Sequence, residues 1–263
     1  MRVILLTHGG ADLVIDRLAR LEGVEVAGVF IEKRVAPERG PIEKLKRSIK
    51  YDGVLATLAK VGQFRNGSAA AADQAADPTR EAAERLGIPV FDLDDYHAPE
   101  SIETIRSSNA DLGVIFGTNI IKESMFSIPK LGSINLHQGM APYYRGGPPV
   151  FWELYNGEKE IGLTVHFVAA KVDTGDIIMQ KAIPLEYDPG FGLDFESFIF
   201  DFRAKLRGES ASLISEAVSS IAAGVHIRNP QDISLGKRYR LPTKKEKNEL
   251  RRRLKERLAK GAL

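Results

Sequence analysis

The first half of the chain alternates short apolar runs with longer polar, amphipathic stretches, and this alternation constrains the fold more than any other feature. Five runs are typical of buried strands: Val3–Leu6, Val24–Ile31, Ile88–Phe91, Leu112–Phe116 and Gly132–Leu136. Helical patterns lie between them, over Asp12–Leu21, Thr79–Leu86 and Ser101–Ser107. Strand and helix in repetition predict a Rossmann-like α/β fold, a mostly parallel sheet with helices on both faces.

The segment between the second strand and the helix at Thr79 is less regular. Within Pro37–Phe64 we expect two helical pieces, broken near Asp52 and Gly53. The Ala-rich stretch Gly67–Asp77 has the composition of a loop.

The second half of the chain has a different pattern. Gly162–Val168 and Ile177–Ile183 alternate apolar and polar residues and are joined closely, which predicts an antiparallel hairpin. A long helical region follows over Phe191–Ala223, then an irregular stretch with a strand pair over Arg228–Leu241, and a last helix over Thr243–Lys260. We therefore expect one α/β domain over residues 1–225, to which the candidate catalytic residues named below belong, and a short C-terminal extension, ending in a basic helix, over residues 226–263.

Composition excludes several classes of site. The chain has 263 residues and no cysteine, so disulfides, thiolate nucleophiles and cysteine zinc sites are excluded. The five histidines contain no pair at helical spacing, so we expect no metal. No dinucleotide or Walker-type glycine motif is present, and no apolar run approaches a membrane span of roughly 20 residues. We expect a soluble, cytoplasmic protein.

Positive charge is concentrated at the C-terminus. Lys244–Lys260 holds nine Lys or Arg and three Glu, a net charge of 9 − 3 = +6, and the rest of the chain carries 2 − 6 = −4. Leu250, Leu254 and Leu258 form a single apolar stripe on this helix. We expect the stripe to pack on its own domain or on a second subunit, with RNA or another polyanion as the alternative partner of the helix.

Asn135 and His137 are two positions apart at the end of the fifth strand, so their side chains leave the chain on the same side. Leu136 between them points to the core. One interpretation is that Asn135 and His137 form a reactive surface while Leu136 holds the strand in the core. The alternative is a buried polar pair that satisfies backbone groups of the following loop.

Asp173 lies in a tight turn, Val172-Asp173-Thr174-Gly175. Asp followed by Gly is a common structural turn. The acid could also orient the imidazole of His137, as carboxylates do in catalytic sites. An amide donor, an imidazole and a carboxylate are the groups needed to move an acyl group between two heteroatoms.

With these residues the chain resembles the folate-dependent formyltransferase family. The resemblance rests on Asn135-Leu136-His137, the loop Pro142–Gly146, the turn at Asp173, and Gly162–His166, over roughly residues 2–223. It implies an enzyme that takes the formyl group from 10-formyltetrahydrofolate and transfers it to a primary amine. It also implies that Asn135 hydrogen-bonds the developing oxyanion, that His137 stabilises that charge or takes a proton, and that Asp173 holds His137.

The resemblance also places the binding residues. The pterin would lie against the strand end Gly117, Thr118, Asn119, Ile120 and Ile121, with Ala169, Ala170 and Val172 completing the pocket. The acceptor would contact His8, Gly9, Gly10, Tyr144 and Arg145.

Departures from the family pattern bear on the acceptor. The loop Gln138–Pro142 differs from the common family sequence, and an acid, Asp12, follows Gly9 and Gly10 where a phosphate loop is expected. About 40 residues follow the core, too few for the tRNA-binding barrel of methionyl-tRNA formyltransferases. We therefore favour a nucleotide-linked amino sugar or another small amine as acceptor. The alternatives are methionyl-tRNA without the usual barrel, hydrolysis of formyltetrahydrofolate, and a non-catalytic binder; a homodimer through the C-terminal region is left open.

Overall fold

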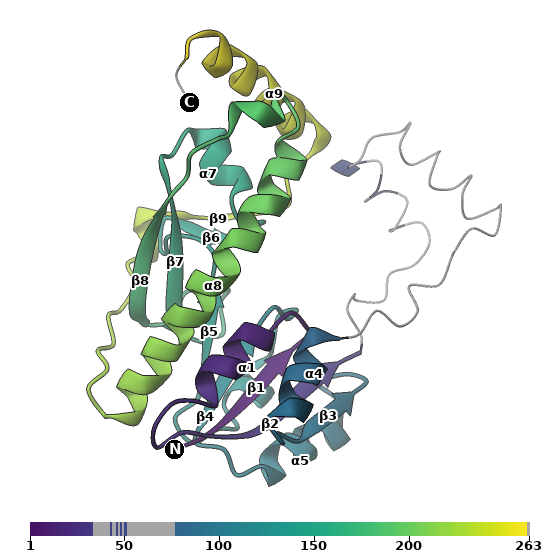
Figure 1. Cartoon of the computed structure of the whole chain (residues 1–263), viewed down its shortest axis with the longest axis vertical. Helices are drawn as coiled ribbons and strands as arrows, with labels where there is room; N and C mark the ends of the chain where they lie inside the picture. The colour runs from purple at the N-terminus through teal and green to yellow at the C-terminus, as the bar shows by residue number, and fades with distance from the viewer. Residues whose placement is uncertain (34–42, 44–45, 47, 49, 52–76, 262–263) are drawn as a thin grey trace, which may run out of the picture.

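The computed structural model describes residues 1–33, 43, 46, 48, 50–51 and 77–261. Its centre is a seven-stranded sheet in the order β3-β2-β1-β4-β5-β7-β8 (Figure 1). The first five strands run parallel, and β7 and β8 form the antiparallel hairpin that the sequence predicts. Strand β7 also pairs antiparallel with β5. The strands are β1 Arg2–Thr7, β2 Glu25–Glu32, β3 Val90–Leu93, β4 Leu112–Phe116, β5 Ser133–His137, β7 Glu160–Phe167 and β8 Ile177–Pro184.

Helices cover both faces of this sheet, which confirms the predicted α/β architecture. They are α1 Asp12–Leu18, α4 Pro78–Arg85, α5 Pro99–Ser107, α6 Glu123–Phe126, α7 Phe151–Asn156, α8 Phe195–Ala222 and α9 Lys244–Ala259, with short 3₁₀ turns at Pro189–Phe191 and Ile233–Leu235. The predicted helical pieces within 37–64 and the predicted loop over 67–77 lie almost entirely outside the described residues.

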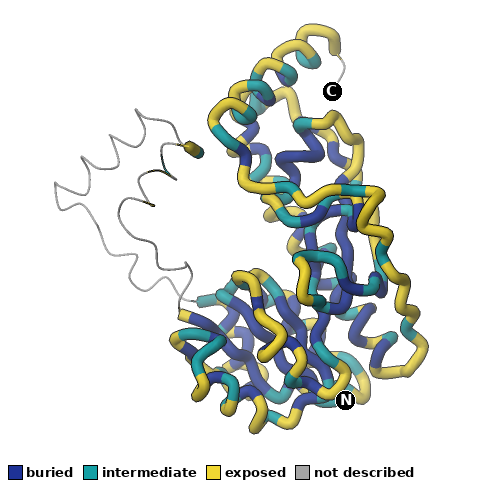
Figure 2. The backbone as a smooth tube through the Cα atoms, turned by 180° about the vertical axis from the view of Figure 1, so that it is seen from behind, coloured by how far each residue is buried: buried dark blue, intermediate teal, exposed yellow. Residues whose placement is uncertain are grey.

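The apolar core has two layers because strand residues alternate between the faces of the sheet. In β1, Val3 and Leu5 pack with the cluster that contains α1, α4 and α8, whereas Ile4 and Leu6 pack with α5 and α6. All four side chains are buried, and Figure 2 shows the buried backbone along the sheet. A sheet covered on both faces leaves the carboxyl ends of its parallel strands as the place where a site can form.

The prediction of a strand pair within Arg228–Leu241 is wrong. Strand β9 (Lys237–Tyr239) pairs instead with β6 (Tyr144–Gly146), and Asn229 bridges to Ile177. Tyr144 lies 237 − 144 = 93 residues before Lys237, and Ile177 lies 229 − 177 = 52 residues before Asn229, so no local pattern reveals these partners. The extension is therefore attached along the loop that follows His137.

The last helix packs on its own chain, one of the two expected arrangements. Leu250 and Leu254 are fully buried, and α9 lies against α7. Arg257 and Arg253 donate from Nη1 to the carbonyls of Leu154 and Tyr155, at 2.9 and 2.7 Å. None of the described helices is both long enough and apolar enough to span a membrane.

Candidate active site

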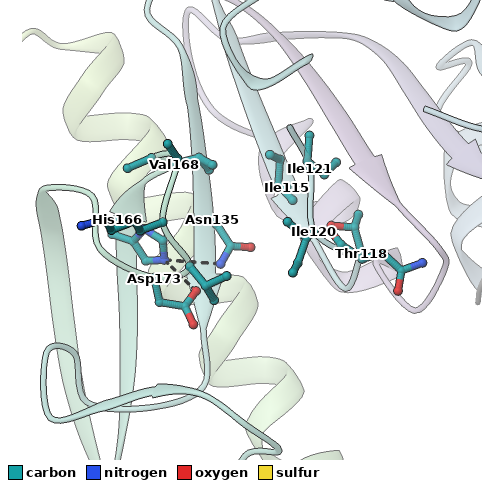
Figure 3. Close-up of a pocket in the computed structure, with 13 residues that line it drawn as sticks. Ile115, Thr118, Ile120, Ile121, Asn135, His166, Val168 and Asp173 are labelled. Atoms are coloured by element: carbon teal, nitrogen blue, oxygen red, sulfur yellow. Dashed lines mark hydrogen bonds and ion pairs between the residues drawn. The ribbon is translucent and has the colours of Figure 1, made fainter. Parts of the chain in front are cut away.

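Strand pairing brings the predicted reactive residues together. Asn135 lies opposite His166 in the antiparallel pairing of β5 and β7. The loop that follows β7 carries Asp173 back over this pair. Asn135 Nδ2 lies 3.4 Å from His166 Nε2, and Asp173 lies 3.5 Å from the same nitrogen (Figure 3). Asp173 also lies 3.3 Å from His137 Nδ1.

Backbone groups of β6 hold both partners of the His137–Asp173 pair. His137 Nε2 lies 2.7 Å from the carbonyl oxygen of Tyr144, which can only accept, so Nε2 carries the proton and donates it. The amide of Gly146 donates to Asp173 Oδ2 at 2.8 Å. In the neutral ring the remaining nitrogen, Nδ1, is then unprotonated and lies beside the carboxylate.

This geometry requires glycine at two positions, where a side chain would clash, and a strained backbone conformation at a third. A Cβ on Gly139 would lie 2.4 Å from His137 Nε2, and one on Gly175 would lie 1.8 Å from the carbonyl oxygen of Phe167. Asp173 itself has φ of +53°, an unfavourable conformation that Asp and Asn adopt more readily than most residues. Strain of this kind is concentrated at functional sites.

Burial and charge set the protonation states. Burial lowers the pKa of His137 more than the neighbouring Asp173 carboxylate raises it, so the imidazole is neutral at pH 7. Burial opposes ionisation of Asp173, but the contacts with His166 and His137 and the Gly146 amide outweigh it and lower its pKa from 3.8 to about 2. The site thus holds an anionic acid beside a neutral imidazole that can accept a proton.

A first cavity opens between the ends of β4 and β7 and is called here the β4–β7 cavity. It measures about 630 Å³ including the part open to solvent. Figure 3 shows Ile115, Thr118, Ile120 and Ile121 on one side and Val168, His166, Asn135 and Asp173 on the other. Asn119, Ala169, Ala170, Lys171 and Val172 complete its lining.

A second cavity, the β1–α8 cavity, measures about 1510 Å³ including the part open to solvent. Asn135 and Thr118 line both cavities. The remaining lining residues of the second are Gly9, Gly10, Phe116, Gly117, Leu136, His137, Gln138, Pro149, Phe200, Arg203, Ala204 and Arg207. The amide of Asn135 therefore stands where two separately bound molecules could meet.

Most residues predicted to bind ligands line these cavities. Gly117 lines the second cavity rather than the first, while the other seven residues predicted for the pterin line the first. Gly9 and Gly10, predicted for the acceptor, line the second.

Three other residues predicted to contact the acceptor lie outside both cavities. His8 Nε2 lies 2.7 Å from a Glu32 carboxylate oxygen, and the Tyr144 ring stacks on Tyr239. Arg145 is 8% exposed and donates to the carbonyls of Pro142, Ile233 and Gly236. The Arg145 guanidinium thus links the loop after His137 to the C-terminal extension, and the predicted contact of Arg145 with the acceptor stays a prediction.

Sequence reasoning missed four residues at the site. His166 is part of the alternating strand, but its place beside Asn135 depends on the β5–β7 register. Phe200, Arg203 and Arg207 belong to the predicted helical region, and only the packing of α8 brings them to the cavity. The described residues contain no group of three side chains that could hold a metal ion.

Comparison with known proteins shows the family to which the chain belongs. The family model described as formyl transferase matches residues 51–189, more than half of the chain. The chain belongs to the formyl transferase family. Among curated members, a methionyl-tRNA formyltransferase of Chlorobium chlorochromatii is 33% identical over 69% of this chain and 55% of its own length. One of Lysinibacillus sphaericus is 35% identical over 59% of this chain and 47% of its own length. The chain thus spans about half the length of these relatives.

Solved members of the family share the fold. Glycinamide ribonucleotide transformylase 1 from Symbiobacterium toebii aligns with a TM-score of 0.58 and 20% identity, covering 88% of this chain and 93% of that one. A 4-N formyltransferase from Francisella tularensis aligns with a TM-score of 0.56 and 17% identity, covering 91% and 76%. At these identities the likeness shows the fold alone.

Proposed function

We propose that the chain transfers the formyl group of 10-formyltetrahydrofolate to a primary amine. The observation that carries this proposal is the position of Asn135, which lines both cavities and lies next to the His137–Asp173 pair. Family membership supports the folate donor. In the reaction, the amine nitrogen forms a bond to the formyl carbon, the bond from that carbon to the donor nitrogen breaks, and a proton passes from the amine to the donor nitrogen.

In this proposal the β4–β7 cavity binds the folate. Ile115, Ile121 and Val168 offer apolar surface to the faces of a flat ring. The loops 117–121 and 168–173 lie outside the strands, so their peptide groups offer donors and acceptors to the ring edges. The amine would then enter from the β1–α8 cavity.

Each reactive side chain has one task in this proposal. The Asn135 amide donates to the formyl oxygen as negative charge develops there. His137, neutral and with Nδ1 unprotonated, takes the proton of the attacking amine. Asp173 stabilises the imidazolium that forms, and the Tyr144 carbonyl fixes the ring tautomer.

For the acceptor we favour a nucleotide-linked amino sugar or another small amine. The second candidate is methionyl-tRNA, because the curated relatives at 33–36% identity are named methionyl-tRNA formyltransferases. The third is water, which would make the enzyme a formyltetrahydrofolate hydrolase; formate release without an amine would favour it.

The test is a mass-spectrometric screen of amines with the formyl donor, scored as gain of one formyl group. In Asn135→Ala, loss of one oxyanion donor is expected to slow transfer on the order of 10²–10³-fold. His137→Ala and Asp173→Ala should also abolish most transfer. The exposed Asp94→Asn serves as control. Near-normal turnover in any of the three site variants would refute its assigned role, and a folate analogue that leaves the Tm unchanged at saturation would refute the donor.

A further inference from the structure

A side chain of the C-terminal extension holds the turn that carries Asp173. Gln231 Nε2 donates a hydrogen bond to the carbonyl oxygen of Gly175, over 2.6 Å. Gly175 lies in the same turn and is packed so closely against the Phe167 carbonyl oxygen that an added Cβ would lie 1.8 Å from it. The hydrogen bond therefore ends on a part of the turn that has little room to move.

Two further contacts hold the extension against this loop. Asn229 exchanges backbone hydrogen bonds of 2.9 and 2.8 Å with Ile177, at the start of β8. The Arg228 guanidinium lies over the Phe167 ring, 3.6 Å from its centroid, at the end of β7. Figure 1 shows the extension beside β8. The loop that carries Asp173 joins these two strands, so the extension contacts both of its ends.

The same extension also holds the other side of the site. Strand β9 pairs with β6, with Tyr239 opposite Gly146, and the Tyr239 ring stacks on Tyr144. The Gly146 amide donates to Asp173 Oδ2. The Tyr144 carbonyl, on the same strand, accepts from His137 Nε2. One stretch of the chain thus contacts both the turn and the strand between which the His137–Asp173 pair is held.

The link between these two points of contact is short and internally hydrogen-bonded. Asp232 Oδ1 accepts from Ser234 twice, from the amide at 3.0 Å and from the hydroxyl at 2.6 Å. Arg145 donates to two carbonyl oxygens of the same stretch, at 3.2 and 3.5 Å. A movement of one point of contact is therefore transmitted to the other. Residues 228–239 are called here the brace.

We propose that the brace positions the His137–Asp173 pair and that Gln231 is a positioning residue for Asp173. Gln231 belongs to the lining of neither cavity, so it acts through the turn and not on a bound substrate. Without its hydrogen bond, the backbone of Asp173, at φ of +53°, is free to relax and to carry the carboxylate away from His137. The inference rests on the proposed function. It adds a role for a segment that lies beyond residues 51–189, the part matched by the family model.

The expected effect follows from the distance between the carboxylate and the imidazole. Asp173 lies 3.3 Å from His137 Nδ1. At an effective dielectric constant of about 20, a shift of about 1 Å away from the imidazolium slows a reaction that depends on this charge about sevenfold. The same shift lowers the pKa of His137, because the neighbouring carboxylate raises it.

Gln231→Met tests the proposal with little change in shape. Gln231 Oε1 is buried and has no hydrogen-bond partner among the described residues, so the variant removes a single hydrogen bond. With an amine found in the screen, we expect kcat to fall about sevenfold and the NMR titration of His137 to move to lower pH. In the Asp173→Asn background the same substitution should change kcat less than twofold, because the carboxylate that Gln231 positions is absent.

Tyr187→Phe is the matched control. The Tyr187 hydroxyl donates to the carbonyl oxygen of Gly192 at 3.1 Å, so this variant also removes one hydrogen bond to a glycine carbonyl. Tyr187 is buried and belongs to the lining of neither cavity. Each variant should lower the Tm by ~2–4 °C, but only Gln231→Met should lower kcat and the pKa of His137.

Three results would overturn the proposal. Equal losses of kcat in Gln231→Met and Tyr187→Phe would reduce the role of Gln231 to general stability. An unchanged His137 pKa in Gln231→Met would show that the turn keeps its place without the hydrogen bond. A full sevenfold loss in the Asp173→Asn background would show that Gln231 acts independently of the carboxylate.

The two proposals fail in different ways, because the NMR titration of His137 needs neither donor nor acceptor. A His137 pKa that falls in Gln231→Met, while no amine is formylated by the parent, leaves the brace standing and overturns formyl transfer. Formyl transfer at the parent rate in Gln231→Met overturns the brace and leaves formyl transfer standing.

Discussion

Asp173→Asn tests the electrostatic part of the site with little change in shape. Asn is nearly isosteric, tolerates the φ of +53°, and keeps an oxygen that can accept from the Gly146 amide. The variant loses the charge 3.3 Å from His137 Nδ1. At an effective dielectric constant of about 20, that charge stabilises an imidazolium by about 5 kcal/mol. The amide dipole recovers part of this energy, so we expect kcat to fall about 10³-fold.

The pH dependence gives an independent measurement of the same effect. The Asp173 carboxylate raises the pKa of His137, so its removal lowers that pKa further. In the proposed mechanism His137 acts in its neutral form, so the acidic limb of the kcat/KM profile should move to lower pH. The imidazole titration of His137 by NMR should move in the same direction. A kcat within tenfold of the parent, or an unchanged or raised His137 pKa, would refute this account of Asp173.

Three further predictions address the surroundings of the site. Gly139→Ala should slow transfer at least tenfold with the fold retained, because the new Cβ would lie 2.4 Å from His137 Nε2 and displace the ring. The control is Gly208→Ala, a helical position where an added Cβ meets no other atom within 4 Å. Arg145→Met should lower the free energy of unfolding by at least about 2 kcal/mol, because three carbonyls lose a charged donor, and should leave the acceptor KM unchanged. Glu153→Gln should stabilise the protein by about 3 kcal/mol at pH 8 and much less at pH 4.5, measured by urea unfolding.

The sign of the Glu153 prediction follows from burial. Burial raises the pKa of Glu153 from 4.5 to about 7. The folded state therefore resists ionisation, and stability that is present below pH 4.5 is lost as the pH rises through 7. A Glu153→Gln variant with the same pH dependence as the parent would contradict this. For Arg145→Met, a raised acceptor KM with unchanged stability would support the substrate contact that the sequence predicts for Arg145.

The sheet could be predicted from the sequence because its strands are short apolar runs separated by helical patterns. Asn135 and His137 could be predicted as a pair because alternation along a strand places both side chains on one side. The contact between Asp173 and His137 depends on the β7–β8 hairpin. The alternation of apolar and polar residues over Gly162–Val168 indicates this hairpin. All of these features depend on local sequence patterns, which is why they could be predicted.

The remaining features of the site depend on contacts between distant segments. A loop arginine such as Arg145 has the same sequence signature whether it binds a ligand or a carbonyl. Its acceptors at Ile233 and Gly236 lie about 90 residues away. Likewise, helical periodicity predicts α8 but does not tell which face meets the cavity, since that depends on the packing of α8 on α1.

The partners that fix the imidazole tautomer and the carboxylate are peptide groups, the carbonyl of Tyr144 and the amide of Gly146. Peptide groups are present whatever side chain the residue carries, so exchange of Tyr144 for another residue leaves them in place. The length of the segment from Gln138 to Gly146, in contrast, determines where both peptide groups lie. Inserting or deleting one residue there would offset both groups from their partners, so the residue count of this segment should stay fixed even where an exposed side chain such as Tyr143 is exchanged.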